Sequence, residues 1–262
     1  MSSFNTDISP KVKKRGRGSE FVKADAAGGI MGQVPLERAL SKLGVASRRQ
    51  TKEWIESGRI KVDGRTIKDP LFLVVPEKAR IALDGKNVIR AVSCTVMLYK
   101  PRGVVTTRSD EKNRKTVYDL LPASLSHLHP VGRLDLATTG LLLMTTDTQL
   151  SNFLTDPDNG IPRIYTLTVQ GRITDEHIKL LLKGIQDKTE VLKASKITLL
   201  KASNKESHLT IELCEGKNRE IRRMFEFLGS QVTRLKRVAY GKLTLGDLSP
   251  GQFKEVAEKE IV

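Results

Sequence analysis

The sequence is short of several features that define protein classes, and each shortage excludes something. No apolar run approaches the roughly 20 residues that a membrane-spanning helix needs, so we do not expect an integral membrane protein. There are two cysteines, Cys94 and Cys214, in apolar strand-like stretches without metal-ligand spacing, which predicts buried free thiols in a reducing, cytoplasmic compartment. The four histidines form no HxH or HxxxH pattern on a clear helix, so we predict no metal.

Acidic residues are also scarce relative to basic ones. Lys and Arg number 45 against 30 Asp and Glu, which gives a net charge of +15. An excess of this sign and size indicates a polyanionic partner, either nucleic acid or an anionic membrane surface. The 262 residues, 39% of them hydrophobic, suffice for one large domain or for a small and a medium one, with a packed core.

Residues 1–33 contain few large apolar side chains and many basic ones between Gly and Ser. Such a segment cannot bury enough surface to offset its ordering entropy, so we predict a disordered basic tail. It has no apolar stretch typical of a secretory signal. An electrostatic arm for RNA and a merely solvated tail both fit. Asp7, Glu20 and Asp25 count against an organelle transit peptide.

Residues 34–92 have the pattern of a small separate domain. Apolar spacing predicts two helices between Leu36 and Gly58, followed by strand pairs around Asp-Gly turns at 63–64 and 84–85. Basic residues crowd around the second helix and the strand after it: Arg38, Lys42, Arg48, Arg49, Lys52, Arg59, Lys61 and Arg65. Such a cluster suits phosphate contacts, and a solvated basic face is the alternative interpretation.

The segment SRRQTKEWIESGRIKVDGR within this domain resembles an S4 domain, an RNA-binding module. The resemblance implies RNA contacts by Arg48, Arg49, Arg59 and Lys61. It does not by itself indicate an enzyme, because S4 domains also occur in ribosomal proteins and other RNA binders.

A second domain is expected over residues 93–262, and its most informative stretch is GRLDLATTGLLLMTTD. The apolar run Leu141–Met144 predicts a buried strand. Asp135 would then lie just before a core strand, on a loop bracketed by Gly132 and Gly140. Rigidly held loops are where reacting groups are often placed. From the spacing alone, an Asp that only caps the following turn fits as well.

The strand expected at Arg163–Val169 is rich in β-branched and aromatic residues, and Tyr165, Leu167 and Val169 share one face. On this pattern alone Tyr165 fits an ordinary half-buried core tyrosine. Further on, EGKNREIRRMF predicts a helix with Asn218 as its N-cap.

Two adjacent arginines in this helix, Arg222 and Arg223, point about 100° apart, so they cannot serve the same role. A basic solvated helix is the alternative interpretation of this segment.

Taken together, GRLDLATTGLLLMTTD, MLYKPRGVVTT, the strand with Tyr165 and EGKNREIRRM resemble the motifs of the RsuA/RluB-type family of ribosomal RNA pseudouridine synthases. The resemblance covers residues 34–258 or so. It implies an α+β protein in which a small S4 domain precedes a catalytic domain with a mixed, largely antiparallel sheet flanked by helices. It also implies an isomerase without a cofactor, acting on ribosomal RNA or ribosome assembly intermediates and having no membrane partner.

The same resemblance implies roles for individual residues. Asp135 would be the nucleophile, Tyr165 would pack on the target base, and Arg222 would pair with Asp135. Contacts to RNA are implied for Arg133, Lys217, Arg219 and Arg223. Arg163 stands where the family usually has Lys, so the positive charge is kept.

Two other classes remain as alternatives. One is a non-catalytic RNA-binding or ribosome-assembly protein with the same fold. The other is a glycosidase-like hydrolase that uses Asp135 with Asp147, but the intervening strand would hold these carboxylates too far apart. We favour large-subunit over small-subunit RNA as the substrate, and a monomer as the default state.

Overall fold

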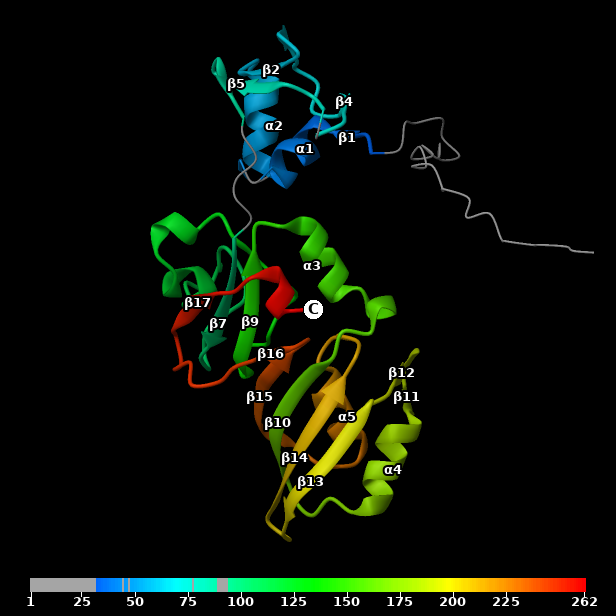
Figure 1. Ribbon diagram of the computed structural model, residues 1–262. Coiled ribbons are helices and arrows are strands. Elements are labelled where there is room, and N and C mark those ends of the chain that lie inside the picture. Colours follow the sequence, from blue (N-terminus) through cyan, green and yellow to red (C-terminus); the bar gives the residue numbers. More distant parts are fainter. Residues whose placement is uncertain (1–31, 44, 47, 77, 89–93) are drawn as a thin grey trace, which may run out of the picture.

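The computed structural model describes residues 32–43, 45–46, 48–76, 78–88 and 94–262, which form a small N-terminal unit and a larger C-terminal one (Figure 1). The predicted basic tail lies outside the described residues except for its last two positions. The predicted domain boundary near residue 92 also lies outside them. Both therefore stay predictions.

The N-terminal unit packs two helices on a small sheet, as the apolar spacing predicts. The helices are α1 (Leu36–Lys42) and α2 (Arg48–Glu56). The strands are β1 (Val34–Pro35), β2 (Ile60–Val62), β3 (Arg65–Thr66), β4 (Leu73–Val74), β5 (Ile81–Leu83) and β6 (Lys86–Asn87). The sheet order is β3-β2-β5-β6, and β1 pairs with β4. Both Asp-Gly turns have positive φ at each residue, which tight hairpin turns require.

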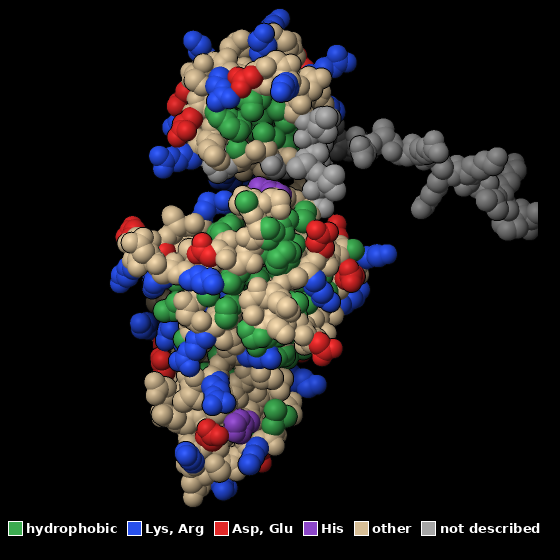
Figure 2. All heavy atoms as spheres, turned by 90° about the vertical axis from the view of Figure 1, so that its left-hand side faces the viewer, with side chains coloured by type: hydrophobic (Ala, Val, Ile, Leu, Met, Phe, Trp, Pro, Cys, Tyr) green, Lys and Arg blue, Asp and Glu red, His purple; other side chains and the backbone are tan. Residues whose placement is uncertain are grey.

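The outer surface of this unit carries the predicted basic residues. Arg48, Arg49 and Lys61 are exposed. Arg59 is also exposed; it forms an ion pair with Asp84, and Arg49 forms one with Glu53 at 3.4 Å. Figure 2 shows Lys and Arg side chains spread around one face of the unit.

The C-terminal unit is built on a nine-stranded sheet with the order β13-β14-β10-β15-β9-β7-β17, to which β16 and β8 are added. Its strands are β7 (Thr95–Lys100), β8 (His129–Pro130), β9 (Thr139–Thr145), β10 (Arg163–Gln170), β13 (Lys196–Ala202), β14 (Glu206–Leu213), β15 (Val232–Tyr240), β16 (Leu243–Thr244) and β17 (Phe253–Glu255). β15 runs parallel to β9, whereas the other described ladders of this sheet are antiparallel. The predicted mixed, largely antiparallel sheet is confirmed.

Helices and a hairpin flank this sheet. They are α3 (Thr148–Thr155), α4 (Asp175–Lys183), α5 (Glu220–Phe227) and the hairpin of β11 (Ile185–Asp187) and β12 (Glu190–Leu192). Short 3-10 turns are η1 (Val117–Leu120), η2 (Ala123–Leu125), η3 (Pro157–Asn159) and η4 (Glu258–Glu260).

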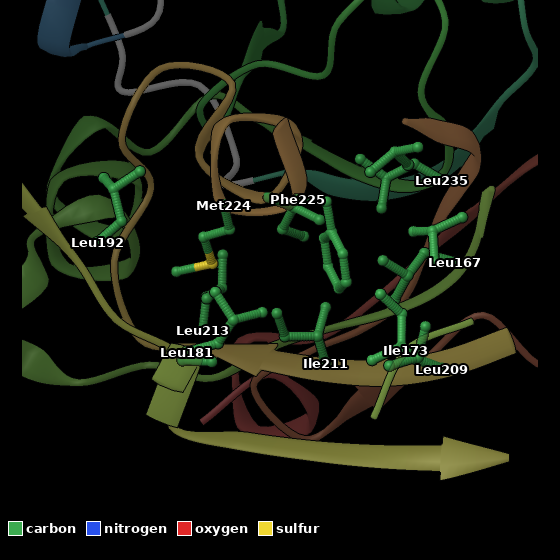
Figure 3. Close-up of a cluster of buried hydrophobic side chains, with 14 of the residues drawn as sticks. Leu167, Ile173, Leu181, Leu192, Leu209, Ile211, Leu213, Met224, Phe225 and Leu235 are labelled. Atoms are coloured by element: carbon green, nitrogen blue, oxygen red, sulfur yellow. The ribbon is translucent and has the colours of Figure 1, made fainter. Parts of the chain in front are cut away.

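Helix α5 is held on the sheet by its apolar face. Met224 and Phe225 are fully buried and project toward Ile211 of β14 (Figure 3). Apolar and polar residues alternate along β14, and Leu209, Ile211 and Leu213 all lie in this core. Burial of this kind contributes about 1.5–3 kcal/mol per large apolar side chain, so α5 is firmly placed and its polar face can carry a site.

The apolar strand after Asp135 is also confirmed. The four residues from Leu141 to Met144 are fully buried within β9. Asp147 follows the end of this strand by two residues and caps α3, accepting hydrogen bonds from the backbone N–H groups of Gln149 (2.7 Å) and Leu150 (3.0 Å).

Three local predictions are wrong. Gly140 is a residue of β9 rather than the end of a loop, and a Cβ there would overlap the Arg237 carbonyl oxygen of β15. The N-cap of α5 is Arg219, with φ of 49°, and not Asn218. Cys94 and Cys214 are free but only half-buried.

Candidate active site

The loop that carries Asp135 is tied down at several points. The Thr138 N–H donates to the Asp135 carbonyl oxygen (3.0 Å), which closes a turn. The Gly103 N–H, just after β7, donates to the Leu136 carbonyl oxygen (2.9 Å). The Asp135 side chain itself is 37% exposed, so it is fixed by its backbone yet open to a ligand.

Lys100 lies beneath this loop and is fully buried. Its Nζ donates to the carbonyl oxygens of Thr138 (2.8 Å) and Pro101 (3.1 Å). Burial lowers the pKa of Lys100 to about 8, and the nearby Asp135 carboxylate opposes this shift. The turn after β7, which begins with Lys100 and Pro101, therefore supports the loop.

Two arginines of α5 face the Asp135 carboxylate. The Arg219 Nη1 lies 3.9 Å from Asp135 Oδ2, and the Arg222 Nε lies 4.0 Å from it. Arg222 is buried, and its Nη1 donates to the Val232 carbonyl oxygen (2.8 Å), which fixes the guanidinium. Burial lowers the pKa of Arg222, as does Arg219, while Asp135 opposes the shift. Asp135 therefore faces one rigid and one exposed cation.

Tyr165 reaches the same place from β10. It is half-buried and packs against the core under α5 and against the core beside β7. A cavity of about 200 Å³ lies between Tyr165, the Asp135 loop and α5. Six of the residues selected from the sequence line it: Arg133, Asp135, Tyr165, Lys217, Arg219 and Arg222. Residues up to 89 positions apart in the chain thus meet in one cavity.

Arg223 does not join them. Its guanidinium pairs with Asp187 of β11 and, at 2.6 Å, with Glu190 of β12. Arg222 and Arg223 therefore do have different roles, as their 100° separation predicts. Because two carboxylates already occupy Arg223, a phosphate contact by this residue has no support in the geometry.

Two buried arginines, Arg163 and Arg237, line the cavity, and this position was not predicted from the sequence for either of them. Arg163 donates to the carbonyl oxygens of Cys214 (2.9 Å) and Leu154 (2.8 Å). Arg237 donates from Nε to the Leu141 carbonyl oxygen (2.6 Å). Both lie against the ring of Tyr240. The alternation of β15 places Arg237 on its apolar face, which is a signal that could have identified it.

Glu220 completes the wall at the start of α5. It is buried, and its Oε2 accepts from the Lys217 N–H (3.2 Å). Burial raises the pKa of Glu220, and the neighbouring Glu215 raises it further. The Lys217 Nζ pairs with Glu215 at 2.6 Å. This loop therefore places a buried carboxyl group with a raised pKa beside the cavity.

Asp135 is the carboxylate of this cavity that faces the arginines of α5. Asp147, the other carboxylate considered, caps α3 at the far end of β9, so the two-carboxylate alternative has no support. Among the described residues, no group of three or more His, Cys, Asp and Glu side chains forms a metal-type cluster. No described helix is long and apolar enough to span a membrane.

Comparison with known proteins fits this site. The family profile described as RNA pseudouridylate synthase matches residues 95–227, and the S4 domain profile matches residues 34–78. A ribosomal large subunit pseudouridine synthase B of Bacillus subtilis is 36% identical over 228 residues, which cover 86% of this chain and 93% of the relative.

Two further similarities agree. A protein of the same name from Pseudomonas aeruginosa is 38% identical over 234 residues, covering 86% of this chain and 60% of the relative. A crystal structure of a pseudouridylate synthase superposes with a TM-score of 0.61 at 26% identity, covering 87% of this chain and 98% of the other. The chain therefore belongs to the RNA pseudouridylate synthase family, a family of isomerases, and carries an S4 domain before its catalytic domain.

Proposed function

We propose that this protein converts a specific uridine of ribosomal RNA, in the large subunit, to pseudouridine, with Asp135 as the nucleophile. The observation that carries the proposal is the meeting of Asp135, Tyr165 and Arg222 in one cavity. The names of the curated relatives from Bacillus subtilis and Pseudomonas aeruginosa support ribosomal RNA as the substrate.

The reaction breaks the bond from N1 of uracil to the ribose and forms one from C5. C5 loses its proton, N1 gains one, and no electrons are transferred, so no cofactor is required. Asp135 forms a transient covalent adduct. Arg222, held on the Val232 carbonyl, keeps the carboxylate directed into the cavity. Tyr165 packs against the uracil, which must first leave its stack.

Affinity for RNA comes from basic side chains that take no part in the reaction itself. Arg133 and Arg219 are exposed at the cavity and contact the flipped nucleotide's backbone, and Lys217 lies beside them. In the N-terminal unit, Arg48, Arg49, Arg59 and Lys61 contact phosphates. Folded RNA shape supplies most of the selectivity. The protein is a cytoplasmic monomer in this account.

The substrate is tested with ribosomal RNA that carries tritium at C5 of uridine. We expect release of label from large-subunit RNA or its assembly intermediates, and one converted position on mapping. Small-subunit RNA and transfer RNA serve as comparisons. Release from small-subunit RNA alone would overturn the choice of subunit. Binding without release from any of these RNAs would favour the non-catalytic alternative.

A further inference from the structure

A second groove, of about 440 Å³, lies on the sheet outside the proposed reaction cavity. Its floor is formed by β10, β14 and β15, and in Figure 1 α4 and α5 lie on the opposite side of these strands. Leu200 on this face is 61% exposed. No described element therefore covers this part of the sheet.

The strand register arranges polar side chains in rows across this face. Residues directly opposite one another on neighbouring strands share a face of the sheet. The rows are Lys236, Thr166 and Thr210 in one, and Arg234, Thr168 and His208 in the other. The two cations are two residues apart on β15, hence about 7 Å along the strand.

The charge of the groove has one sign. Arg102, Arg234 and Lys236 line it, and none of the described residues that line it is Asp or Glu. Glu206, at the edge of this face, bonds His208 at 3.1 Å. Arg and Lys next to threonine hydroxyls are the side chains that commonly contact phosphate oxygens and sugars in nucleic-acid complexes. Figure 2 shows Lys and Arg side chains projecting from the lower half of the molecule.

The groove adjoins the loop that carries Asp135. Ala137 and Thr139, at the end of that loop, line the groove, whereas Asp135 lines the reaction cavity. Arg102 lines the groove from the turn after β7, and its charge contributes to the lowered pKa of Arg222. An RNA strand with one nucleotide bound at Asp135 therefore has to cross only this loop to reach the groove.

We propose that this basic groove, lined by Arg102, Arg234 and Lys236, binds the ribose-phosphate chain of the single RNA strand next to the target uridine. The proposal rests on the function proposed above, because it takes RNA as the substrate. It adds a binding surface to those of the S4 domain and the reaction cavity. The groove holds the strand by charge and hydroxyl contacts, so it contributes affinity without reading sequence.

The test compares two double variants of the full chain. Arg234→Gln/Lys236→Gln removes two charges from the groove. Lys254→Gln/Lys259→Gln removes two exposed charges from the C-terminal segment. The dissociation constant for RNA is measured against salt concentration, without turnover. We expect the slope of log Kd against log salt to fall by about 1 per groove residue, with no change for the control. Turnover by the control variant at saturating RNA stays at the wild-type level.

A second measurement does not depend on variants. RNA with 4-thiouridine beside the target is cross-linked to the unaltered protein, and we expect cross-linked peptides from β15. Unchanged salt slopes in the groove variant, an equal loss in the control, or cross-links confined to other elements would overturn the proposal. If one of these three results is found while the wild-type enzyme releases label, only the groove proposal fails and the proposed function stands. If the wild type releases no label, the proposed function is contradicted, whatever the salt slopes of RNA binding are.

Discussion

At the scale of single residues, the site depends on one arginine that does two things. Arg222 anchors itself on the Val232 carbonyl with Nη1 and turns Nε toward Asp135. A planar guanidinium can hold both partners in fixed directions, whereas a lysine ammonium is a single point on a flexible stem. The role of Arg222 is therefore geometric as well as electrostatic.

Arg222→Lys keeps the positive charge and loses this geometry. We expect kcat to fall by about 100-fold, since small misplacements of a reacting group have effects of that order. The dissociation constant for RNA stays within about twofold. Single-turnover kinetics and equilibrium binding on the same RNA check both statements. A variant with unaltered kcat would show that charge alone is sufficient.

At the scale of elements, the start of α5 carries both Arg222 of the proposed reaction site and the buried carboxyl group of Glu220. The Glu220 carboxyl has a raised pKa, about 8 against an ordinary 4.5. Between these two values the folded protein retains a proton that the unfolded chain releases. The free energy of unfolding therefore falls as pH rises through this window, and the contribution of Glu220 is flat below it.

Glu220→Gln cannot titrate, so its stability declines less between pH 5 and pH 8 than that of the wild type. Glu226→Gln, on the exposed face of the same helix, is the matched control and follows the wild type. Urea unfolding at both pH values measures the difference. Parallel declines in all three proteins would mean that Glu220 is ionised in the folded state.

The elements also show what the sequence could predict. The buried strand at Leu141–Met144 and the helices follow from local spacing, and these predictions hold. The inclusion of Gly140 in β9 depends on β15, almost 100 residues further along the chain. The ion pairs of Arg223 similarly depend on a hairpin more than 30 residues earlier. Such long-range partners leave no local pattern in the sequence. The motifs therefore identified which residues line the cavity, but not which contacts those residues make.

At the scale of the whole molecule, the +15 charge is distributed over two units. In the N-terminal unit, Arg48 and Lys61 are exposed cations, whereas Arg59 is already paired with Asp84. Cations paired with a carboxylate release fewer counterions on binding RNA than free ones do. We therefore expect Arg48 and Lys61 to contribute more to RNA binding by the S4 domain than Arg59 does.

Arg48→Gln/Lys61→Gln is expected to reduce the salt slope of RNA binding by about 2 and to leave kcat at saturating RNA unchanged. Arg59→Gln is expected to reduce the slope by less than half of that. Filter binding over a range of salt concentrations measures both. An equal effect per residue in the two variants would contradict the argument from ion pairing.

The central claim is that Asp135 is the reacting carboxylate, and the most direct measurement compares Asp135→Asn with Asp147→Asn. Asn remains a good N-cap, so Asp147→Asn preserves α3. With C5-tritiated ribosomal RNA, we expect Asp135→Asn to reduce label release on the order of 10⁴-fold or more while binding RNA normally, and Asp147→Asn to stay active. Release by Asp135→Asn at the wild-type rate would contradict the account.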